Sequence, residues 1–431
     1  MYRKILSSLI KWKENHSKMA LLLSGARQTG KTYILKEFCE KHFEQSLYIN
    51  FDEESKFVSI FEDSLNPEEI IKKIEILCSR KLDIENTIFF FDEIQVSERA
   101  ITSLKYFSES KKNYKIVCAG SLLGVKLNRF KASFPVGSVY FENMYPMDFE
   151  EFLLAAGEEE LNNEINKSFN TLKELNDALH RKALSYYKAY LCVGGMPRAI
   201  LEYLKAGKDF AVFDRNIHSS ILLAYLADMA KYSTGTNAVK LNHVYQSMPA
   251  QLAKEKKKFT YKLVGNKAKK ETYESAIEWL LLSGLLLKSS RVEMAQAPLS
   301  AYQNNNIFKL YMSDIGLLCN LAKLQFGDIL LDSNIMYKGI LTENFIAQTF
   351  KCKGYELYYW ESKGLAEMDF LLNLDGHIIP VEVKASENTS SKSLFSYVGR
   401  YKPDYSIRIS TKNFGYVNGI KSIPLYSAHN I

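Results

Sequence analysis

The segment ALLLSGARQTGKT at residues 20–32 joins a short apolar run to a glycine-rich stretch, and the helical pattern TYILKEF at 32–38 continues from it. Residues 25–32 fit the pattern GxxxxGK[ST]. Glycines let successive backbone N–H groups curl around a phosphate, and the start of a helix adds its positive dipole end. A strand, this loop and a helix in that order predict a phosphate-binding P-loop on a parallel α/β sheet.

Each position of this loop is expected to help hold a nucleotide. Lys31 is expected to reach the β- and γ-phosphates, and the Thr32 hydroxyl is expected to ligate Mg²⁺. A simple glycine turn that caps a helix is the poorer explanation, because strand, loop and helix follow the expected order. The predicted nucleotide-binding residues are Gly25, Ala26, Arg27, Gln28, Thr29, Gly30, Lys31 and Thr32.

A second apolar run, TIFFFDE at residues 87–93, ends in two carboxylates. Taken alone, such a pair is usually part of a solvated turn, but after a P-loop and behind a hydrophobic strand it indicates a Walker B element. We expect Asp92 to hold Mg²⁺ through water and Glu93 to polarise the attacking water. The apolar run at 116–119 leads to Ser121, which is either a polar sensor of the γ-phosphate or an ordinary turn serine.

Composition narrows the class of protein. The chain has 431 residues, of which 47% are hydrophobic and 24% are charged. These values exclude a disordered tail protein, a collagen-like fibre and a disulfide-rich miniprotein. No apolar run approaches the roughly 18 residues that a membrane helix needs, and the 6 cysteines are scattered without a CxxC pattern. We therefore expect a cytoplasmic protein with reduced thiols and no membrane segment.

Four regions separate by their hydrophobic pattern. Residues 20–150 alternate strand-like and helical runs, which is typical of a parallel sheet covered on both faces. The runs at 20–23, 46–51, 87–91 and 115–119 are expected to be its buried strands. Residues 151–232 carry apolar positions at helical spacing and read as an all-helical subdomain. Two helical runs and then two strand-like runs follow in 233–334, which is the order of a winged helix. Residues 335–431 combine an amphipathic helix with several strands.

The net charge of +7 is concentrated in the segment 254–270. A basic loop of this kind can neutralise DNA phosphates without sequence preference, and such affinity falls steeply with salt; the alternative is a solvated surface loop. Glu271, Glu274 and Glu278 on the next helix argue against reading bases in a groove, so a purely structural module is equally expected. The lysines of the segment are Lys254, Lys256, Lys257, Lys258, Lys262, Lys267, Lys269 and Lys270.

A second group of charged residues lies near the C-terminus, on the runs MDFLL (368–372) and IIPVEVK (378–384). The segment between them is long enough for a turn between antiparallel strands, so Asp369 can face Glu382 and Lys384. Two carboxylates and a lysine that converge in this way predict a Mg²⁺ site with a cation able to stabilise developing charge. Glu343, on the helical run TENFIAQTF, could add a fourth polar group.

Together the segments resemble the AAA+-type ATPases with a C-terminal nuclease-like domain, a large prokaryotic family. The resemblance implies that Asn50 restrains the catalytic Glu93, and that Arg129 is an arginine finger acting on a neighbouring subunit of a homo-oligomer. It also implies that Pro197 contacts adenine and that Arg198 is a second sensor; surface ion pairing is the alternative for both arginines. The motifs that carry the resemblance are GARQTGKT (25–32), YINFDE (48–53), FFFDEIQ (89–95), CAGSLLG (118–124) and MYPMDFEEF (144–152).

The C-terminal pattern resembles the PD-(D/E)xK nuclease core. Asp369, Glu382 and Lys384 match its motif positions, and Glu343 matches its helical acid. Met368 stands where that motif has proline. The resemblance implies a restriction-endonuclease-like fold, and it leaves open whether the domain cuts nucleic acid, because many proteins with this fold keep these residues without demonstrable cleavage.

We therefore predict an α/β protein of four parts: a P-loop AAA+-like core (1–150), a helical lid (151–232), a winged helix (233–334) and a nuclease-like domain (335–431). The expected activity is Mg²⁺-dependent ATP hydrolysis, with ATP and Mg²⁺ bound, coupled to a tail that acts on DNA. The alternative is a nucleotide-operated switch whose last two domains only bind protein or nucleic acid. Two features distinguish the hypotheses. One is the pair Glu93 and Arg129, and the other is an intact group of Asp369, Glu382 and Lys384.

Overall fold

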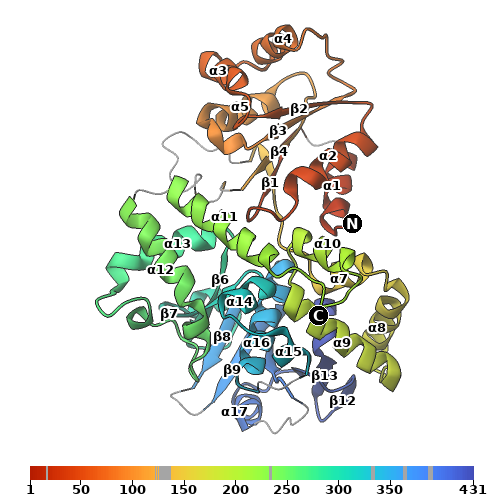
Figure 1. The fold of residues 1–431 in the computed structure, drawn as a ribbon, viewed down its shortest axis with the longest axis vertical. Helices are drawn as coiled ribbons and strands as arrows, with labels where there is room; N and C mark the ends of the chain where they lie inside the picture. The colour runs from red at the N-terminus through yellow and green to blue at the C-terminus, as the bar shows by residue number, and fades with distance from the viewer. Residues whose placement is uncertain are drawn as a thin grey trace. The chain divides into compact units, whose positions relative to one another are not determined.

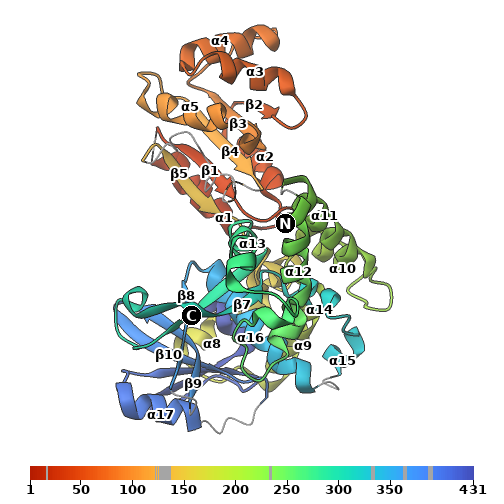
Figure 2. The same ribbon diagram turned by 90° about the vertical axis from the view of Figure 1, so that its left-hand side faces the viewer.

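The computed structural model describes residues 1–15, 18–121, 123, 125, 137–232, 235–331, 335–362, 366–386 and 392–431 (Figures 1 and 2). The chain divides into two compact units. The N-terminal unit comprises Arg3–Tyr145 with Leu282–Gly284, and the C-terminal unit comprises Met1–Tyr2, Pro146–Leu281 and Leu285–Ile431. No helix in the described ranges combines the length and the apolar character needed to cross a bilayer.

The N-terminal unit is built on a parallel sheet with the strand order β2-β3-β4-β1-β5. The predicted strands at 20–23, 46–51, 87–91 and 115–119 are confirmed. Because the strands run parallel, the carboxyl ends of β1 and β3, where the P-loop and Asp92 lie, meet at one edge of the sheet. The strands are β1 (Ala20–Ser24), β2 (Gln45–Asn50), β3 (Thr87–Asp92), β4 (Lys115–Gly120) and β5 (Val139–Asn143).

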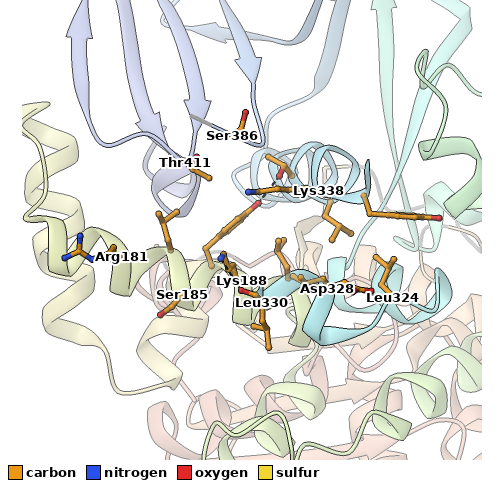
Figure 3. A pocket seen from close by; sticks show the side chains of 16 residues that line it. Arg181, Ser185, Lys188, Leu324, Asp328, Leu330, Lys338, Ser386 and Thr411 are labelled. Atoms are coloured by element: carbon orange, nitrogen blue, oxygen red, sulfur yellow. Dashed lines mark hydrogen bonds between the residues drawn. The ribbon is translucent and has the colours of Figure 1, made fainter. Parts of the chain in front are cut away.

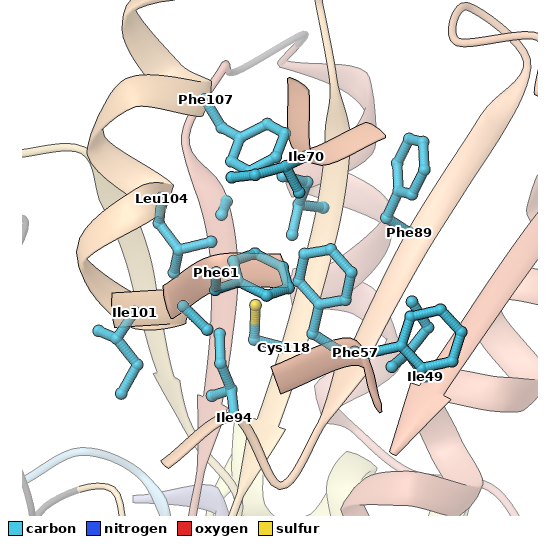
Figure 4. Packing of buried hydrophobic residues seen from close by; sticks show 14 of the residues in the cluster. Ile49, Phe57, Phe61, Ile70, Phe89, Ile94, Ile101, Leu104, Phe107 and Cys118 are labelled. Atoms are coloured by element: carbon cyan, nitrogen blue, oxygen red, sulfur yellow. The ribbon is translucent and has the colours of Figure 1, made fainter. Parts of the chain in front are cut away.

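Both faces of this sheet are covered, as the unbroken apolar strands require. Phe89 and Phe91 of β3 pack with α3, α4 and α5 on one face (Figure 4). Ile88 and Phe90 point the other way and pack with α1 and α2. The helices are α1 (Ile5–Glu14), α2 (Lys31–His42), α3 (Ser55–Asp63), α4 (Pro67–Leu77) and α5 (Glu98–Glu109), with the 3₁₀ turn η1 (Ile94–Val96) after β3.

The C-terminal unit begins with helices, as the spacing of apolar residues in 151–232 predicts. Asp148 and Glu151 form a capping box at the start of α7, and Asn176 caps α9. Pro197 occupies the first turn of α10, where its missing N–H has no intrahelical partner to lose. These helices are α7 (Phe149–Ala155), α8 (Glu159–Thr171), α9 (Asp177–Val193), α10 (Pro197–Lys205) and α11 (Asn216–Tyr232).

The predicted order of two helices and a hairpin is present in 233–334, but its hairpin is not a separate wing. Strand β6 pairs with β7 on one side and, in parallel, with β8 (Leu357–Glu361) on the other. The boundary predicted between 334 and 335 therefore falls within a single sheet. The elements are α12 (Gly235–Leu252), η2 (Tyr261–Leu263), α13 (Lys270–Leu282), β6 (Leu286–Val292), η3 (Leu299–Tyr302), β7 (Gln303–Met312), α14 (Ile315–Leu321) and α15 (Phe326–Leu330).

The resulting sheet has the strand order β12-β13-β11-β10-β9-β8-β6-β7. Helix α16 packs on one face, where Phe350 meets Phe370, and α17 packs on the other, where Tyr397 meets Trp360. The predicted antiparallel pairing of 368–372 with 378–384 is seen between β9 and β10. The elements are α16 (Ile335–Cys352), β8 (Leu357–Glu361), β9 (Glu367–Leu374), β10 (His377–Val383), α17 (Lys392–Tyr401), β11 (Ser406–Ser410), β12 (Gly415–Val417), β13 (Ile420–Pro424) and η4 (Leu425–Asn430).

Candidate functional site

The glycine-rich loop between β1 and α2 takes a conformation that its glycines make possible. Gly25 has φ 146°, and a Cβ there would lie 2.1 Å from the Met144 carbonyl oxygen. Gly30 has φ 96° and stands just before the first residue of α2. The loop therefore presents backbone N–H groups at a helix N-terminus, which is the arrangement that binds phosphate.

Lys31 is folded over this loop rather than extended into solvent. Its Nζ donates hydrogen bonds to the carbonyl oxygens of Gly25, at 2.9 Å, and of Ala26, at 2.8 Å. A side chain held at the centre of the loop is suited to meet a phosphate there, because its ammonium lies beside the amides that would receive the phosphate.

Arg3 holds the loop from outside and was not identified from the sequence. Its Nη1 donates to the Thr29 carbonyl oxygen at 2.7 Å, and its Nη2 donates to the Tyr145 carbonyl oxygen at 2.8 Å. The arginine is buried. It lies far from the loop in the sequence and belongs to no motif, so only the tertiary structure shows its role in positioning the loop.

The carboxylate of Asp92, at the end of β3, receives hydrogen bonds from three residues in the described part of the chain. The Thr32 Oγ1 hydroxyl donates to Oδ2 at 2.8 Å, and the Tyr48 hydroxyl donates to the same oxygen at 3.0 Å. The Glu93 amide donates to Oδ1 at 3.0 Å. Burial and the neighbouring Asp92 carboxylate raise the pKa of Tyr48, so it remains a donor at neutral pH.

The paired oxygens of Thr32 and Asp92 fit the chemistry of Mg²⁺. This cation prefers hard oxygen ligands and keeps several of its waters, so a hydroxyl beside a carboxylate is a suitable donor set. The predicted metal-binding residues Thr32 and Asp92 are thus brought together next to the phosphate-binding loop.

Glu93 follows Asp92 in the left-handed backbone region, with φ 51°. Gln95 Nε2 donates to the Glu93 carboxylate, and the Ser121 hydroxyl donates to the same Oε2 at 3.5 Å. Gly120 leaves room for this contact, because a Cβ on it would lie 2.2 Å from Gln95 Oε1. The structure brings together the predicted Glu93 and Ser121 and adds Gln95, which the FFFDEIQ segment already contained.

The predicted C-terminal acids fall into two adjoining ion-pair groups. In the first, Glu343 of α16 accepts a hydrogen bond from the Tyr311 hydroxyl at 2.5 Å and pairs with Lys309 at 3.0 Å and with Lys257. Lys309 also reaches Glu367 at 2.5 Å. Burial alone would raise the pKa of Glu343, but the two lysines hold its pKa below the ordinary value.

Asp369 belongs to the edge of this first group. Its Oδ2 accepts a hydrogen bond from the Val383 amide at 2.8 Å. Burial, and then the nearby Glu343 carboxylate, raise the pKa of Asp369 to about 7. Two carboxylates that share one lysine-rich environment thus carry pKa values moved in opposite directions.

Glu382 and Lys384 form the second group together with a residue that sequence reasoning missed. Glu382 is buried and pairs with Lys384 Nζ at 3.2 Å and with Arg408 Nε of β11 at 3.3 Å. The parallel register places Arg408 directly opposite Glu382. Within the residues that the structure describes, no cluster of three or more His, Cys, Asp or Glu side chains is arranged to hold a metal ion.

A cavity of about 510 Å³ lies elsewhere in the C-terminal unit, between α9, α15 and α16 (Figure 3). Leucine side chains and Tyr187 form much of its wall, and Lys188 at its edge donates to the Leu330 carbonyl oxygen at 3.2 Å. The predicted site residues are not among the residues that line it.

The part of the chain that holds the glycine-rich loop matches a known protein family. The model of the AAA domain family matches residues 17–153. Residues 17–153 are therefore similar to an AAA domain. Two families of unknown function match the C-terminal unit, DUF8612 at residues 184–327 and DUF4143 at residues 338–428.

A curated relative and two solved structures share features with the chain. An uncharacterized protein of Methanocaldococcus jannaschii is 30% identical over 207 residues, which are 48% of this chain and 39% of the relative. A Walker-type ATPase of Pyrococcus abyssi is 15% identical with a TM-score of 0.45, covering 75% of this chain and 96% of that one. The ORC2 protein of Aeropyrum pernix is 13% identical with a TM-score of 0.39, covering 77% and 95%.

The remaining predicted residues of the AAA-type site fall in different places. Asn50 accepts a hydrogen bond from the Asp52 amide at 3.0 Å, whereas the hydrogen bonds found on the Glu93 carboxylate in the described ranges come from Gln95 and Ser121. The predicted restraint of Glu93 by Asn50 is therefore not what the structure has. Arg129 lies outside the described residues.

Pro197 and Arg198 start α10, which belongs to the C-terminal unit and not to the N-terminal unit that holds the glycine-rich loop. The turn before them, Gly194 and Gly195, packs against Asp314. The Gly195 amide donates to Asp314 Oδ2 at 2.6 Å, and a Cβ on Gly194 would lie 2.4 Å from Oδ1. These glycines are therefore needed for the close approach of the buried Asp314, whatever the role of Pro197.

Proposed function

We propose that the chain binds ATP with Mg²⁺ at its AAA domain and hydrolyses it. The observation that carries the proposal is the grouping of Thr32, Asp92 and Glu93 at the end of β3 beside a glycine loop that contains Lys31. A hydroxyl, a carboxylate and a second carboxylate in this order serve metal binding and proton acceptance in phosphoryl transfer.

Each residue of the site then has a distinct task. The amides of residues 25–32 and the Lys31 ammonium would hold the phosphates, and Thr32 with Asp92 would hold Mg²⁺. Bound Mg²⁺ supplies charge that stabilises the phosphate oxygens. Glu93 would orient the attacking water and accept its proton, and Ser121 would report the state of the γ-phosphate.

The contact between Gln95 and Glu93 holds the proposed catalytic base in an inactive arrangement. The Glu93 carboxylate receives hydrogen bonds from Gln95 and Ser121. To act on water, the carboxylate exchanges at least one of these partners. We infer that Gln95, and not Asn50, restrains the base. Because Gln95 lies on η1 and Ser121 follows β4, a movement of either element would change the rate of ATP turnover.

Roles carried by residues outside this group remain part of the proposal. Arg129 would act as a finger on a neighbouring copy in a homo-oligomer, and Pro197 with Arg198 would contact the nucleotide. The segment 254–270 would bind DNA phosphates, and the cell compartment would be the cytoplasm. The resemblance to the AAA+ family supports the roles of Arg129, Pro197 and Arg198. The lysines of 254–270 support the contact with DNA, and the scattered cysteines support the compartment.

A nucleotide-operated switch whose C-terminal unit only binds its partner is the second candidate. The specific observation in its favour is that Glu343 and Glu382 are each paired with two basic side chains. Carboxylates that are already neutralised attract a divalent cation less strongly. Under this proposal the nuclease-like residues Asp369, Glu382 and Lys384 stabilise the sheet, and the metal site and cutting predicted for them are absent.

Binding of ATP by a Lys31→Ala variant tests the proposed nucleotide site. The variant should lose most of its affinity for a fluorescent ATP analogue in the presence of Mg²⁺, because the ammonium beside the loop amides is gone. Lys41→Ala is the matched control, since Lys41 lies on the same helix and pairs with Glu37 at 2.5 Å on the surface. Equal affinity in the two variants would contradict the assignment.

A further inference from the structure

The segment 254–260, here called the lysine strap, crosses the open side of strand β7. Lys258 forms an antiparallel bridge with Lys309, and the Phe259 amide donates to the Phe308 carbonyl oxygen at 2.8 Å. The rings of Phe259 and Phe308 stack with centroids 5.5 Å apart. The strap therefore extends the eight-stranded sheet by a short pairing and does not hang freely in solvent.

Three lysines of the strap neutralise two buried carboxylates. Lys257 pairs with Glu343 of α16, and Lys258 pairs with Glu361 at the end of β8. Lys256 lies 3.7 Å from the same Glu361. The side chains of Glu343 and Glu361 are 6% and 7% exposed, so the loss of their cations would leave buried charges that are costly to keep.

The lysine side chains are more exposed to solvent than the two carboxylates, each to a different degree. The Lys256 side chain is 61% exposed and that of Lys258 is 29% exposed. Lys262 and Lys267, which follow the strap, are also exposed. The outer side of the strap is thus basic, and its inner side is paired with carboxylates of α16 and β8.

This arrangement changes the expectation for DNA binding by the segment 254–270. Lysines that are paired with carboxylates add little to the attraction of a polyanion, because their charge is already compensated. The exposed Lys262 and Lys267 can meet phosphates at once, whereas Lys257 and Lys258 can do so only by leaving Glu343 and Glu361.

We propose that the lysine strap is an electrostatic latch which nucleic acid opens: phosphates of the DNA backbone replace Glu343 and Glu361 as partners of the strap lysines. The latch deepens the proposed DNA contact of this segment and rests on it. Opening would separate the strap from β7 and uncover Glu343 of α16, so that DNA binding is coupled to the exposure of this carboxylate.

Substitution of Glu361 tests the latch in the full chain. Affinity for a fluorescein-labelled DNA duplex would be measured by anisotropy over a range of salt concentrations, for wild type and Glu361→Gln. The variant releases Lys256 and Lys258, so we expect tighter binding by about three- to tenfold at low salt and a salt slope steeper by up to about 2. Removing both lysines in the Glu361→Gln background should cancel the gain.

The control removes one negative charge without touching the strap. Glu293 is exposed and lies 3.6 Å from Arg291, so Glu293→Gln changes the net charge equally. If Glu361→Gln and Glu293→Gln bind DNA alike, or if the gain survives removal of the lysines, the latch is refuted while DNA binding stands. If neither wild type nor Glu361→Gln binds the duplex at low salt, the proposed DNA contact and the latch fail together.

Hydrogen exchange gives a readout that needs no substitution. The Phe259 amide is protected by its bond to the Phe308 carbonyl oxygen, and opening of the strap breaks that bond. Saturating DNA should therefore speed exchange of the peptide that contains Phe259 in the wild-type protein. Unchanged or slower exchange of this amide with DNA bound would contradict the latch.

Discussion

Replacement of Lys309 by methionine should destabilise the C-terminal unit strongly. Lys309 is 1% exposed and lies 3.0 Å from Glu343 and 2.5 Å from Glu367. Methionine fills a similar volume but has no charge, so two carboxylates lose a common cation inside the sheet. Breaking a buried ion pair from one side costs about 3–5 kcal/mol of the free energy of unfolding.

This cost can be read from the melting temperature. A domain of more than 150 residues loses roughly 2 °C per kcal/mol, so we expect a fall of about 6–10 °C in differential scanning calorimetry of the full chain. Lys270→Met is the control, because Lys270 forms an exposed pair with Glu274 at 3.5 Å, and such pairs contribute about 0–1 kcal/mol.

A double variant distinguishes the loss of charge pairing from a packing defect. Adding Glu343→Gln to Lys309→Met removes one of the stranded charges, so the melting temperature should recover in part. A Lys309→Met protein that melts within 2 °C of the Lys270→Met control would refute the reasoning, since roughly 1 kcal/mol is too little for a buried pair.

Two further outcomes follow from the carboxylates. Asp369 has a pKa raised from 3.8 to about 7 in the folded chain. Between these two values the folded state holds a proton that the unfolded state has released, so the stability of the protein falls as pH rises from about 4 to about 7. The Asp369→Asn variant should therefore have a higher melting temperature than wild type at pH 8 and the same melting temperature at pH 4. An equal difference in melting temperature at both pH values would contradict this. Gln95→Leu removes a hydrogen bond to the Glu93 carboxylate that is worth about 1.5 kcal/mol, so ATP turnover should rise by up to about tenfold; a fall in steady-state phosphate release would show that Gln95 positions Glu93 and does not restrain it.

The candidate site of the N-terminal unit was predictable because its residues lie in a few contiguous segments of the sequence. Residues 25–32 fix the loop through glycines with positive φ, and the apolar run 87–91 fixes a strand whose end carries Asp92 and Glu93. Parallel pairing of such strands then places both carboxylates beside the loop. Arg3 and Tyr48 were not predicted because they act through contacts with residues distant in the sequence, and no motif or residue spacing indicates such contacts.

The C-terminal unit was predictable in its elements but not in their assembly. The β9–β10 hairpin follows from two strand-like runs and a short turn. The parallel pairing of β6 with β8 does not, because any exposed strand edge can accept a partner and the sequence pattern does not say which. For the same reason, the sequence does not show that Lys257 and Lys309 pair with Glu343. Both lysines lie in the segment that was expected to form the separate winged helix.

Hydrolysis of ATP by Glu93→Gln beside wild type tests the central claim most directly. The amide keeps the size of the side chain but cannot accept a proton from water. With Mg²⁺ present, the variant should bind ATP within a few-fold of wild type and release phosphate about 10²- to 10⁴-fold more slowly in a single turnover. Hydrolysis at the wild-type rate would contradict the account, because the end of β3 would then not be the catalytic centre.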